Sequence, residues 1–254
     1  MLRRIYFLAR DFLFDLIFPC FCVGCGVEGD WICPDCLKKI DIIKQPFCPE
    51  CRRPTRVGEF CGGCRSRFVL DGIFICANLE EGALKEAVHQ FKYGFISDIG
   101  KGLGRLMAGK LRAVSCSKCH LLWGGGLGFD YIIPVPLHEK RKRWRGFNQA
   151  EILGCELSQI SREFYKWRGV SYDDKILLRK KHTRPQMELG REERLENLKG
   201  GFVVETCHGM PLQGKNILLV DDITTTGATL EECAKALKKA GAEKVWGIVL
   251  AKGK

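Results

Sequence analysis

Residues 217–229 constrain the fold more than any other stretch of the chain. Their first four residues are apolar, which predicts a strand buried on both faces of a sheet. Asp221 and Asp222 follow, then a turn rich in threonine and glycine, and then a helical pattern over residues 230–239. A buried strand that leads through a short polar loop into a helix is the repeating unit of α/β folds. The stretch therefore predicts a mainly parallel sheet flanked by helices.

The loop after this strand has the chemistry of a phosphate site. Backbone N–H groups and the positive end of the following helix dipole attract a dianion. Gly227 lets the backbone approach the anion, and the threonine hydroxyls are additional donors. The two carboxylates would repel a phosphate, so we expect them to face sugar hydroxyls beside it. A buried strand with an acidic helix cap is the plainer alternative. The predicted ligand-binding residues are Asp221, Asp222, Thr224, Thr225, Thr226, Gly227, Ala228 and Thr229.

Strands and helices alternate along most of the chain, which supports the same fold class. The predicted strands are residues 71–79, 131–136, 217–220 and 245–250, and the predicted helices are residues 83–91, 98–114, 150–161 and 230–239. In open α/β sheets, ligands bind at the carboxyl ends of the strands, where the phosphate loop lies. We assign residues 68–254 to this domain, and residues 1–67 to an N-terminal helix followed by a cysteine-rich module.

Eight of the 15 cysteines form four Cys-x-x-Cys pairs within the first 64 residues. Two thiolates at this spacing chelate from one tight turn, and two such turns complete a tetrahedral zinc site. We prefer one site from the first two pairs and one from the last two. A crossed arrangement, or a single zinc ion with the other thiols free, stays open. Bound zinc should supply much of the folding free energy of so short a segment. The predicted ligands are Cys22, Cys25, Cys33, Cys36, Cys48, Cys51, Cys61 and Cys64.

The first 21 residues are apolar but interrupted by charges, and no span approaches the roughly 18–20 apolar residues that a membrane helix needs. They predict a helix that packs on the protein, with attachment to a membrane surface as the alternative. The segment has no small-residue cleavage site of an export signal. We therefore expect a cytoplasmic protein that is not integral to a membrane, in which the cysteines favour metal over disulfides.

Positive charge is concentrated near the middle of the chain. The net charge is +11, and residues 131–200 contain 16 Lys and Arg against 10 Asp and Glu. Such an excess fits a polyanion, either a pyrophosphate-bearing ligand or nucleic acid. Lys92, residues 140–145 and the polar residues 183–197 could contribute to one site, with a helix-dipole role for the lysine and a solvated loop at 140–145 as alternatives. The candidates are Lys92, Arg141, Arg143, Arg145, Asn148, Gln149, Gln186 and Arg194.

Residues 217–229 resemble the phosphoribosyl pyrophosphate (PRPP) motif of type I phosphoribosyltransferases. Over nearly the whole chain, the order of motifs resembles the ComF family of competence-associated phosphoribosyltransferase-like proteins. These motifs are the cysteine pairs, Phe-Lys-Tyr-Gly at 91–94, Pro-Val-Pro-Leu at 134–137, Arg-Gly-Phe-Asn-Gln-Ala at 145–150, a Thr-x-x-Gln hood with Arg-x-x-Asn, and the PRPP motif. The segment 116–128, which contains Cys116, Cys119 and His120, has no counterpart in that pattern.

The resemblance implies a role for each part of the site. Asp221 and Asp222 would hold the ribose hydroxyls of PRPP and act in catalysis, and residues 225–229 would hold its 5-phosphate. Basic residues at 141–145 would hold pyrophosphate through Mg²⁺. The resemblance also implies a role in natural transformation or the use of external DNA.

Three functions compete at this point. The first is a PRPP-dependent transferase with an unknown acceptor. The second is a DNA-uptake component that binds single-stranded DNA, uses PRPP as a regulatory ligand, and stacks bases on Trp144 and Phe147, although both aromatic residues could equally be core. The third is a structural zinc adaptor with a vestigial site. Intact acidic and threonine residues in the PRPP motif rank the adaptor last.

Overall fold

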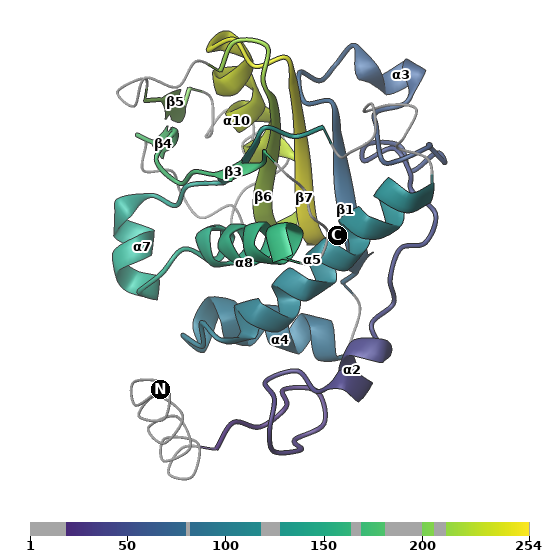
Figure 1. Ribbon diagram of the computed structural model, residues 1–254, viewed down its shortest axis with the longest axis vertical. Coiled ribbons are helices and arrows are strands. Elements are labelled where there is room, and N and C mark those ends of the chain that lie inside the picture. The colour runs from purple at the N-terminus through teal and green to yellow at the C-terminus, as the bar shows by residue number, and fades with distance from the viewer. Residues whose placement is uncertain are drawn as a thin grey trace.

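A computed structural model describes residues 19–79, 82–117, 128–163, 169–180, 200–205 and 212–253. Its centre is a five-stranded parallel sheet with the strand order β1-β7-β6-β2-β3 (Figure 1). The strands are β1 (Gly72–Asn78), β2 (Tyr131–Pro134), β3 (Ser171–Tyr172), β6 (Asn216–Thr224) and β7 (Lys244–Lys252). The predicted α/β class with a mainly parallel sheet is confirmed. Within the described residues, no helix combines the length and the apolar character needed to cross a membrane.

The central strands are apolar along their length because helices cover both faces of the sheet. Alternate side chains of β6 enter different cores. Leu218 and Val220 belong to one hydrophobic cluster, and Ile217 and Leu219 belong to the other. The parallel register places Val220 beside Pro134 of β2 and Ile248 of β7, so the three strands end at one edge of the sheet.

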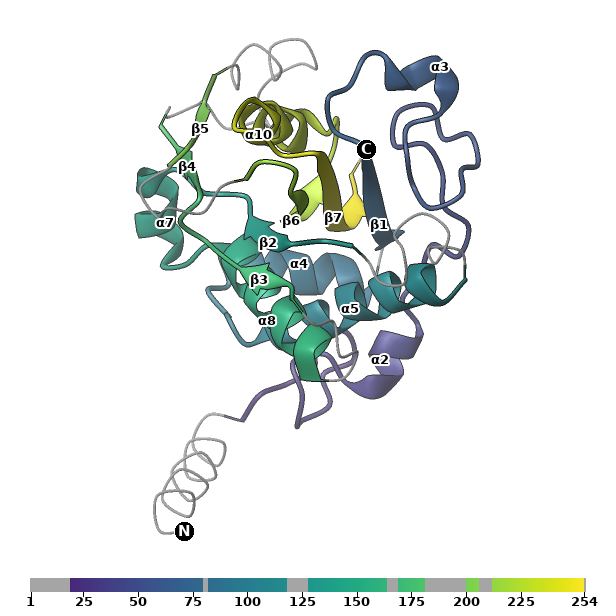
Figure 2. The same ribbon diagram turned by 45° about the horizontal axis from the view of Figure 1, so that its top comes forward.

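Three helices pack on one face of the sheet and one on the other (Figure 2). The first face carries α4 (Ala83–Tyr93), α5 (Ile99–Ser117) and α8 (Gln149–Glu163), and the opposite face carries α10 (Ala228–Lys239). Close packing explains one small residue, since a Cβ at Gly247 in β7 would lie 2.9 Å from Leu230 of α10. The four helices predicted for this domain are present, each within three residues of its predicted ends. Residues 1–18 of the predicted N-terminal helix lie outside the described residues.

The cysteine-rich segment lies against both faces of the same sheet (Figure 2). Its helices are α2 (Pro34–Lys38) and α3 (Gly62–Arg65). Cys36 of α2 belongs to the cluster with α4 and α5, whereas Cys64 of α3 belongs to the cluster with α10. Between these helices the chain crosses the outer edge of β1, where Ile42 bridges Ala77. A second bridge joins Glu59 to Gly72 at the other end of the strand.

Several short elements, including β3, are absent from what the sequence predicts, and two of them bear on the site. Residues 139–145 form a helix, α7 (Glu139–Arg145), where no helix is predicted. The side chain of His138 caps it by accepting from Lys140 N at 3.2 Å, and Gly146 ends it in a left-handed conformation with φ 75°. The antiparallel pair β4 (Leu177–Arg179) and β5 (Phe202–Val204) is also absent from the prediction, because its strands are too short to show a period.

Candidate functional site

A cavity of about 680 Å³ opens at the carboxyl edge of the sheet, a size typical of small-molecule sites. Three parts of the fold form its wall: the segment from β6 into α10, the ends of α4 and β2 with α7, and β4. Its charged lining residues are Lys92, Lys140, Arg141, Arg145, Arg179, Asp221 and Asp222. Five cations against two carboxylates make the cavity attractive to a polyanion.

The phosphate loop, residues 224–229, forms one wall of this cavity. Gly227 is the N-cap of α10 and has φ 79°, a left-handed conformation that glycine adopts without strain. The turn is held locally, because Thr226 Oγ1 accepts a hydrogen bond from Ala228 N at 3.3 Å. The loop thus places backbone N–H groups and hydroxyls at the start of a twelve-residue helix, as anion binding requires. All eight residues predicted for this side line the cavity.

The acidic pair lies at the end of β6, which continues through Asp221 and Asp222 to Thr224. Asp222 Oδ2 forms an ion pair with Lys92 Nζ at 3.2 Å, across from the last turn of α4. Asp221 Oδ1 accepts from the backbone N–H of Asp222 at 2.8 Å. Burial, together with the charge of Asp222, raises the pKa of Asp221 to about 7. A cation or a sugar hydroxyl beside Asp221 and Asp222 would stabilise the ionised form of Asp221 by interacting with its carboxylate.

The basic side is built mainly on α7, whose period decides which of its residues face the cavity. Lys140, Arg141, Trp144 and Arg145 line it, as expected for positions i, i+1, i+4 and i+5 of one helical face. Arg143, which the sequence also proposed, is exposed and is not part of the lining. Two of the three predicted arginines of this segment therefore line the cavity.

Asn148 and Gln149 are buried in hydrogen bonds within the protein and do not line the cavity. Asn148 donates from Nδ2 to Val135 O at 3.0 Å, and its Oδ1 accepts from Ala150 N at 3.1 Å at the start of α8. Gln149 Nε2 donates to Phe91 O at 3.1 Å, which ties α8 to α4. These contacts position the wall of the cavity. Gln186 and Arg194, like Cys119 and His120, lie outside the described residues.

The sequence did not point to Arg179, which β4 brings to the cavity from a distant part of the chain. Its guanidinium lies over the ring of Phe202 with 5.3 Å to the centroid. Burial, and then the nearby Arg141, lower the pKa of Arg179. Arg141 and Arg179 thus both add positive charge to the lining of the cavity, which favours an anionic ligand.

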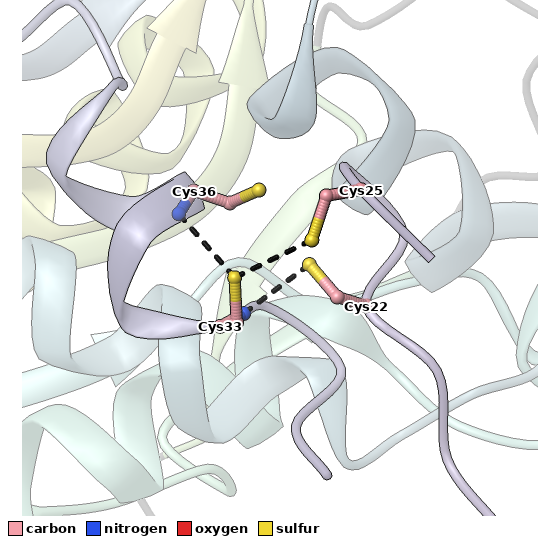
Figure 3. A group of neighbouring side chains, drawn as sticks. All are labelled: Cys22, Cys25, Cys33 and Cys36. Atoms are coloured by element: carbon pink, nitrogen blue, oxygen red, sulfur yellow. Dashed lines mark hydrogen bonds between the residues drawn. The ribbon is translucent and has the colours of Figure 1, made fainter. Parts of the chain in front are cut away.

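The eight predicted cysteine ligands form two groups in sequential order, which decides between the arrangements left open by spacing. Within each group the four sulfur atoms lie within 4.8 Å of one another: Cys22, Cys25, Cys33 and Cys36 in the first, and Cys48, Cys51, Cys61 and Cys64 in the second. Figure 3 shows the first group, in which the thiols of one turn and those at the start of α2 converge on one point. Four thiols around one point fit tetrahedral structural zinc and leave no open coordination position.

Backbone donors prepare one thiolate in each group. Burial opposes ionisation of Cys22, but N–H groups that include that of Cys33, 3.3 Å from its sulfur, outweigh burial and lower the pKa of this thiol to about 6. The same balance lowers the pKa of Cys48 to about 7. Zinc binds thiolates, so a sulfur that ionises near neutral pH favours metal binding at that pH.

Comparison with known proteins gives two domain matches. A double zinc ribbon domain matches residues 13–65, and a phosphoribosyl transferase domain matches residues 194–254. The chain is 30% identical over 238 residues to Competence protein F of Haemophilus influenzae, covering 91% of this chain and 96% of that protein. The chain belongs to the ComF family.

Other members are comparably similar. DNA utilization protein YhgH of Escherichia coli strain K12 is 30% identical over 236 residues, which cover 91% of this chain and 96% of that protein. Competence protein ComFC of Bacillus subtilis is 26% identical over 221 residues, which cover 83% and 79% of the two chains. These matches confirm the predicted family, its zinc ribbon and its phosphoribosyltransferase domain.

Proposed function

We propose that this ComF-family protein binds PRPP with Mg²⁺ and transfers its phosphoribosyl group to an acceptor, in the cytoplasm, as part of the use of external DNA. One observation carries the proposal: a phosphate loop, an acidic pair and a cationic helix face line a single cavity. The proposal includes two structural zinc ions, one in each cysteine group. The names of its relatives, which refer to competence and DNA utilization, support the proposed biological role.

The two walls of the cavity match the two ends of PRPP. Residues 225–229 bind the 5-phosphate, because N–H groups and hydroxyls converge there at the start of α10. Asp221 and Asp222 lie beside this loop and accept hydrogen bonds from the ribose hydroxyls. Lys92, Arg141 and the other lining cations face the pyrophosphate.

The transfer step follows from this placement. The bond between ribose C1 and the pyrophosphate oxygen breaks, and its electron pair leaves with pyrophosphate. A nucleophilic atom of the acceptor then bonds to C1 and loses any proton that it carried. The carboxylates stabilise positive charge on the ribose while the cations stabilise the departing pyrophosphate, both of which develop only in the transition state. Bound Mg²⁺ would add charge neutralisation at the pyrophosphate.

Calorimetric titration with PRPP and Mg²⁺ tests the proposal. The Asp221→Asn/Asp222→Asn variant should lose binding. Asp173→Asn/Asp174→Asn is the matched control, since it removes the same two charges from an adjacent pair that does not line the cavity. Pyrophosphate release in the presence of candidate bases and nucleotides then tests transfer. A folded wild-type protein that binds no PRPP would contradict the proposal at its first step.

A second candidate function, binding of single-stranded DNA, is favoured by an aromatic cluster at the rim of the cavity. Tyr93, Phe95 and Trp144 are 37%, 55% and 60% exposed, and the ring of Trp144 lies 6.3 Å from Tyr93 and 6.0 Å from Phe95. Exposed rings beside cations are the usual platform for unpaired bases. Phe147, the other candidate ring, packs against Phe91 at 5.5 Å and belongs to the core periphery.

Fluorescence anisotropy with a labelled oligothymidylate tests this second function. Trp144→Ala should weaken binding by about 1 kcal/mol or more, as expected for a lost stacking contact. Phe21→Ala is the control, because Phe21 is 49% exposed in the cysteine-rich segment. Reversing the charges of Arg141, Arg143 and Arg145 should flatten the salt dependence of binding. Equal affinities of wild type and the Trp144 variant would remove this candidate.

A further inference from the structure

The two cysteine groups differ in what lies beside them, and this difference has consequences for the phosphate loop. Cys22 and Cys36 of the first group pack in the cluster formed by α4 and α5. Cys48 and Cys64 of the second group pack in the cluster that contains Ala228 and Leu230, the beginning of α10. The second group therefore shares a core with the helix whose N-terminus is proposed to bind phosphate, while the first group lies on the opposite face of the sheet.

The turn of the second group lies beside the phosphate loop. Pro49 and Phe60 line a crevice of about 10 Å³, about the space of one water molecule, together with Thr224, Thr226 and Gly227 of the loop. Elements this close transmit displacement, since packed interiors have few voids that could absorb it. Movement of the turn at Pro49 would thus move the loop.

A lysine joins the same two elements. Lys252 Nζ donates to the carbonyl of Pro49, which lies between the zinc ligands Cys48 and Cys51. Lys252 is paired in register with Thr224 of β6, and the next residue, Gly253, donates from its N–H to Thr224 O at 2.8 Å. The lysine therefore connects the metal-binding turn with the residue that begins the phosphate loop.

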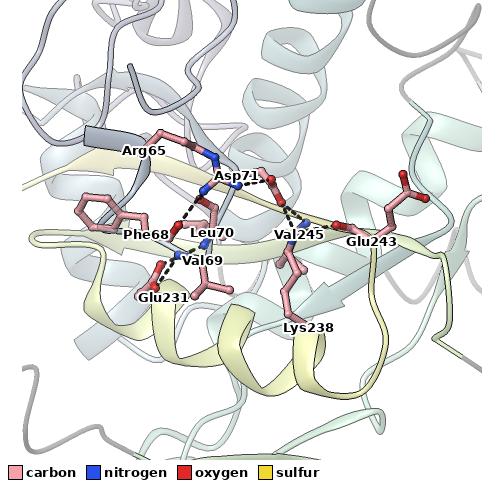
Figure 4. A network of polar contacts seen from close by, with 9 residues as sticks. All are labelled: Arg65, Phe68, Val69, Leu70, Asp71, Glu231, Lys238, Glu243 and Val245. Carbon is pink, nitrogen blue, oxygen red and sulfur yellow. Dashed lines mark hydrogen bonds and ion pairs between the residues drawn. The ribbon is translucent and has the colours of Figure 1, made fainter. Parts of the chain in front are cut away.

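The segment that leaves the second group also fixes α10 at both ends (Figure 4). Near the start of the helix, the buried carboxylate of Glu231 accepts from Val69 N at 2.8 Å and from Leu70 N at 3.1 Å. Near its end, Lys238 forms an ion pair with Asp71 at 2.9 Å. A buried carboxylate that bonds two neighbouring backbone N–H groups defines a position closely, because it would be costly to leave unpaired.

Arg65 of α3 completes the connection to the metal-binding helix (Figure 4). Its guanidinium donates to Phe68 O at 2.7 Å and to Asp71 Oδ1 at 2.8 Å. Arg65 directly follows the zinc ligand Cys64 in the chain. A continuous set of contacts thus runs from the second cysteine group through residues 65–71 to the helix that presents the phosphate loop.

We infer that the second cysteine group, with Lys252 and Glu231 as positioning residues, holds the phosphate loop in its binding geometry and makes ligand affinity depend on the metal content of that group. The first group has no such role. The inference rests on the proposed function, because the affinity at issue is that for PRPP. Anion binding requires N–H groups at fixed positions, so loss of metal from the second group displaces the loop and weakens binding.

A matched pair of variants tests the inference in the full chain. Cys51→Ser and Cys25→Ser each remove an exposed thiol from the second position of the first Cys-x-x-Cys pair of its group. Zinc content, thermal unfolding and calorimetric affinity for PRPP with Mg²⁺ are measured for both. We expect each variant to lose about one zinc ion. The loss of PRPP affinity should be at least about tenfold larger for Cys51→Ser than for Cys25→Ser. Equal losses of affinity would overturn the inference.

Substitution of Lys252 is a second test, which leaves every zinc ligand in place. It can be used even if Cys51→Ser does not fold. Lys252→Met removes the bond to Pro49 O, and Lys252→Arg retains a donor. We expect the methionine variant to keep its zinc, to weaken PRPP binding and to speed hydrogen exchange at residues 224–229, and the arginine variant to restore both. An unchanged exchange rate at the loop in Lys252→Met would overturn the inference.

Hydrogen exchange also separates this inference from the proposed function. If the wild-type protein binds no PRPP, the proposed function fails. Hydrogen exchange at residues 224–229 can still be compared between Cys51→Ser and Cys25→Ser in that case. Faster exchange in Cys51→Ser alone supports the connection between the second group and the loop. Equal exchange in the two variants would overturn it.

Discussion

The two walls of the cavity present charge in different ways. On one side, residues 224–229 present backbone N–H groups and short side chains, fixed between β6, α10 and the second cysteine group. On the other side, long cationic side chains extend from α7, a helix of seven residues with no buried member. The first wall depends on where the backbone lies, and the second on charges that can adjust. A single change should therefore abolish binding at the first wall and only reduce it at the second.

Two glycines should show the largest difference between the walls. Gly227 and Gly146 have φ of 79° and 75°, so alanine at either position should cost about 1–2 kcal/mol of stability through left-handed backbone strain. Only Gly227 belongs to the phosphate loop. We expect Gly227→Ala to weaken PRPP binding by about a hundredfold and Gly146→Ala to weaken it far less. Thermal unfolding and calorimetry check both, and equal effects on affinity would contradict the distinction between the walls.

Substitution of single arginines on α7 should have a smaller, graded effect. Arg141 lines the cavity and Arg143 does not, although both belong to the same short helix. Arg141→Ala should weaken PRPP binding by about tenfold, the value of one charge-assisted hydrogen bond. Arg143→Ala is the matched control and should change affinity by less than about twofold. Comparable losses in the two variants would show that only the net charge of the helix matters.

The acidic pair predicts a pH dependence of stability that the basic wall does not share. Burial and the charge of Asp222 raise the pKa of Asp221 to about 7 in the folded protein, so the folded state binds more protons than the unfolded state between the two pKa values. The free energy of unfolding of the ligand-free protein should therefore fall as pH rises from about 4 to about 7, relative to that of Asp221→Asn. Denaturant titrations at several pH values check this. A pH-independent difference would show that Asp221 ionises normally.

The smallest effect on affinity should come from Asn148, despite its place next to α7 in the sequence. Its side chain bonds Val135 O and caps α8, so Asn148→Ala should cost about 1–3 kcal/mol of stability. PRPP affinity of the folded variant should stay within about threefold of wild type, because the residue does not line the cavity. A larger loss of affinity at unchanged stability would show that Asn148 contributes directly to ligand binding.

The same contrast explains how much the sequence can predict. The phosphate loop and both cysteine groups are local in the chain, so their residue types and spacing determine what they can bind. Arg179 could not be found in this way, since a short strand carries it to the cavity from far along the chain. The structural role of Asn148 could have been predicted, because an asparagine that precedes a helix is a frequent N-cap. A helical period over residues 139–145 would likewise have separated Arg141 from Arg143.

The path of the cysteine-rich segment along β1 bears on how the chain avoids aggregation during folding. An uncovered outer strand offers its free backbone groups to any other chain, and such edges are common starting points of aggregation. Here Ile43 N donates to Cys76 O at 3.0 Å and Ile73 N donates to Gly58 O at 2.9 Å, so the outer edge of β1 is occupied. The opposite edge is β3, a strand of only two residues. Residues 42–43, between the two cysteine groups, and residues 58–59, within the second group, shield β1. We therefore expect a chain that has not yet acquired metal to leave that edge open to other chains.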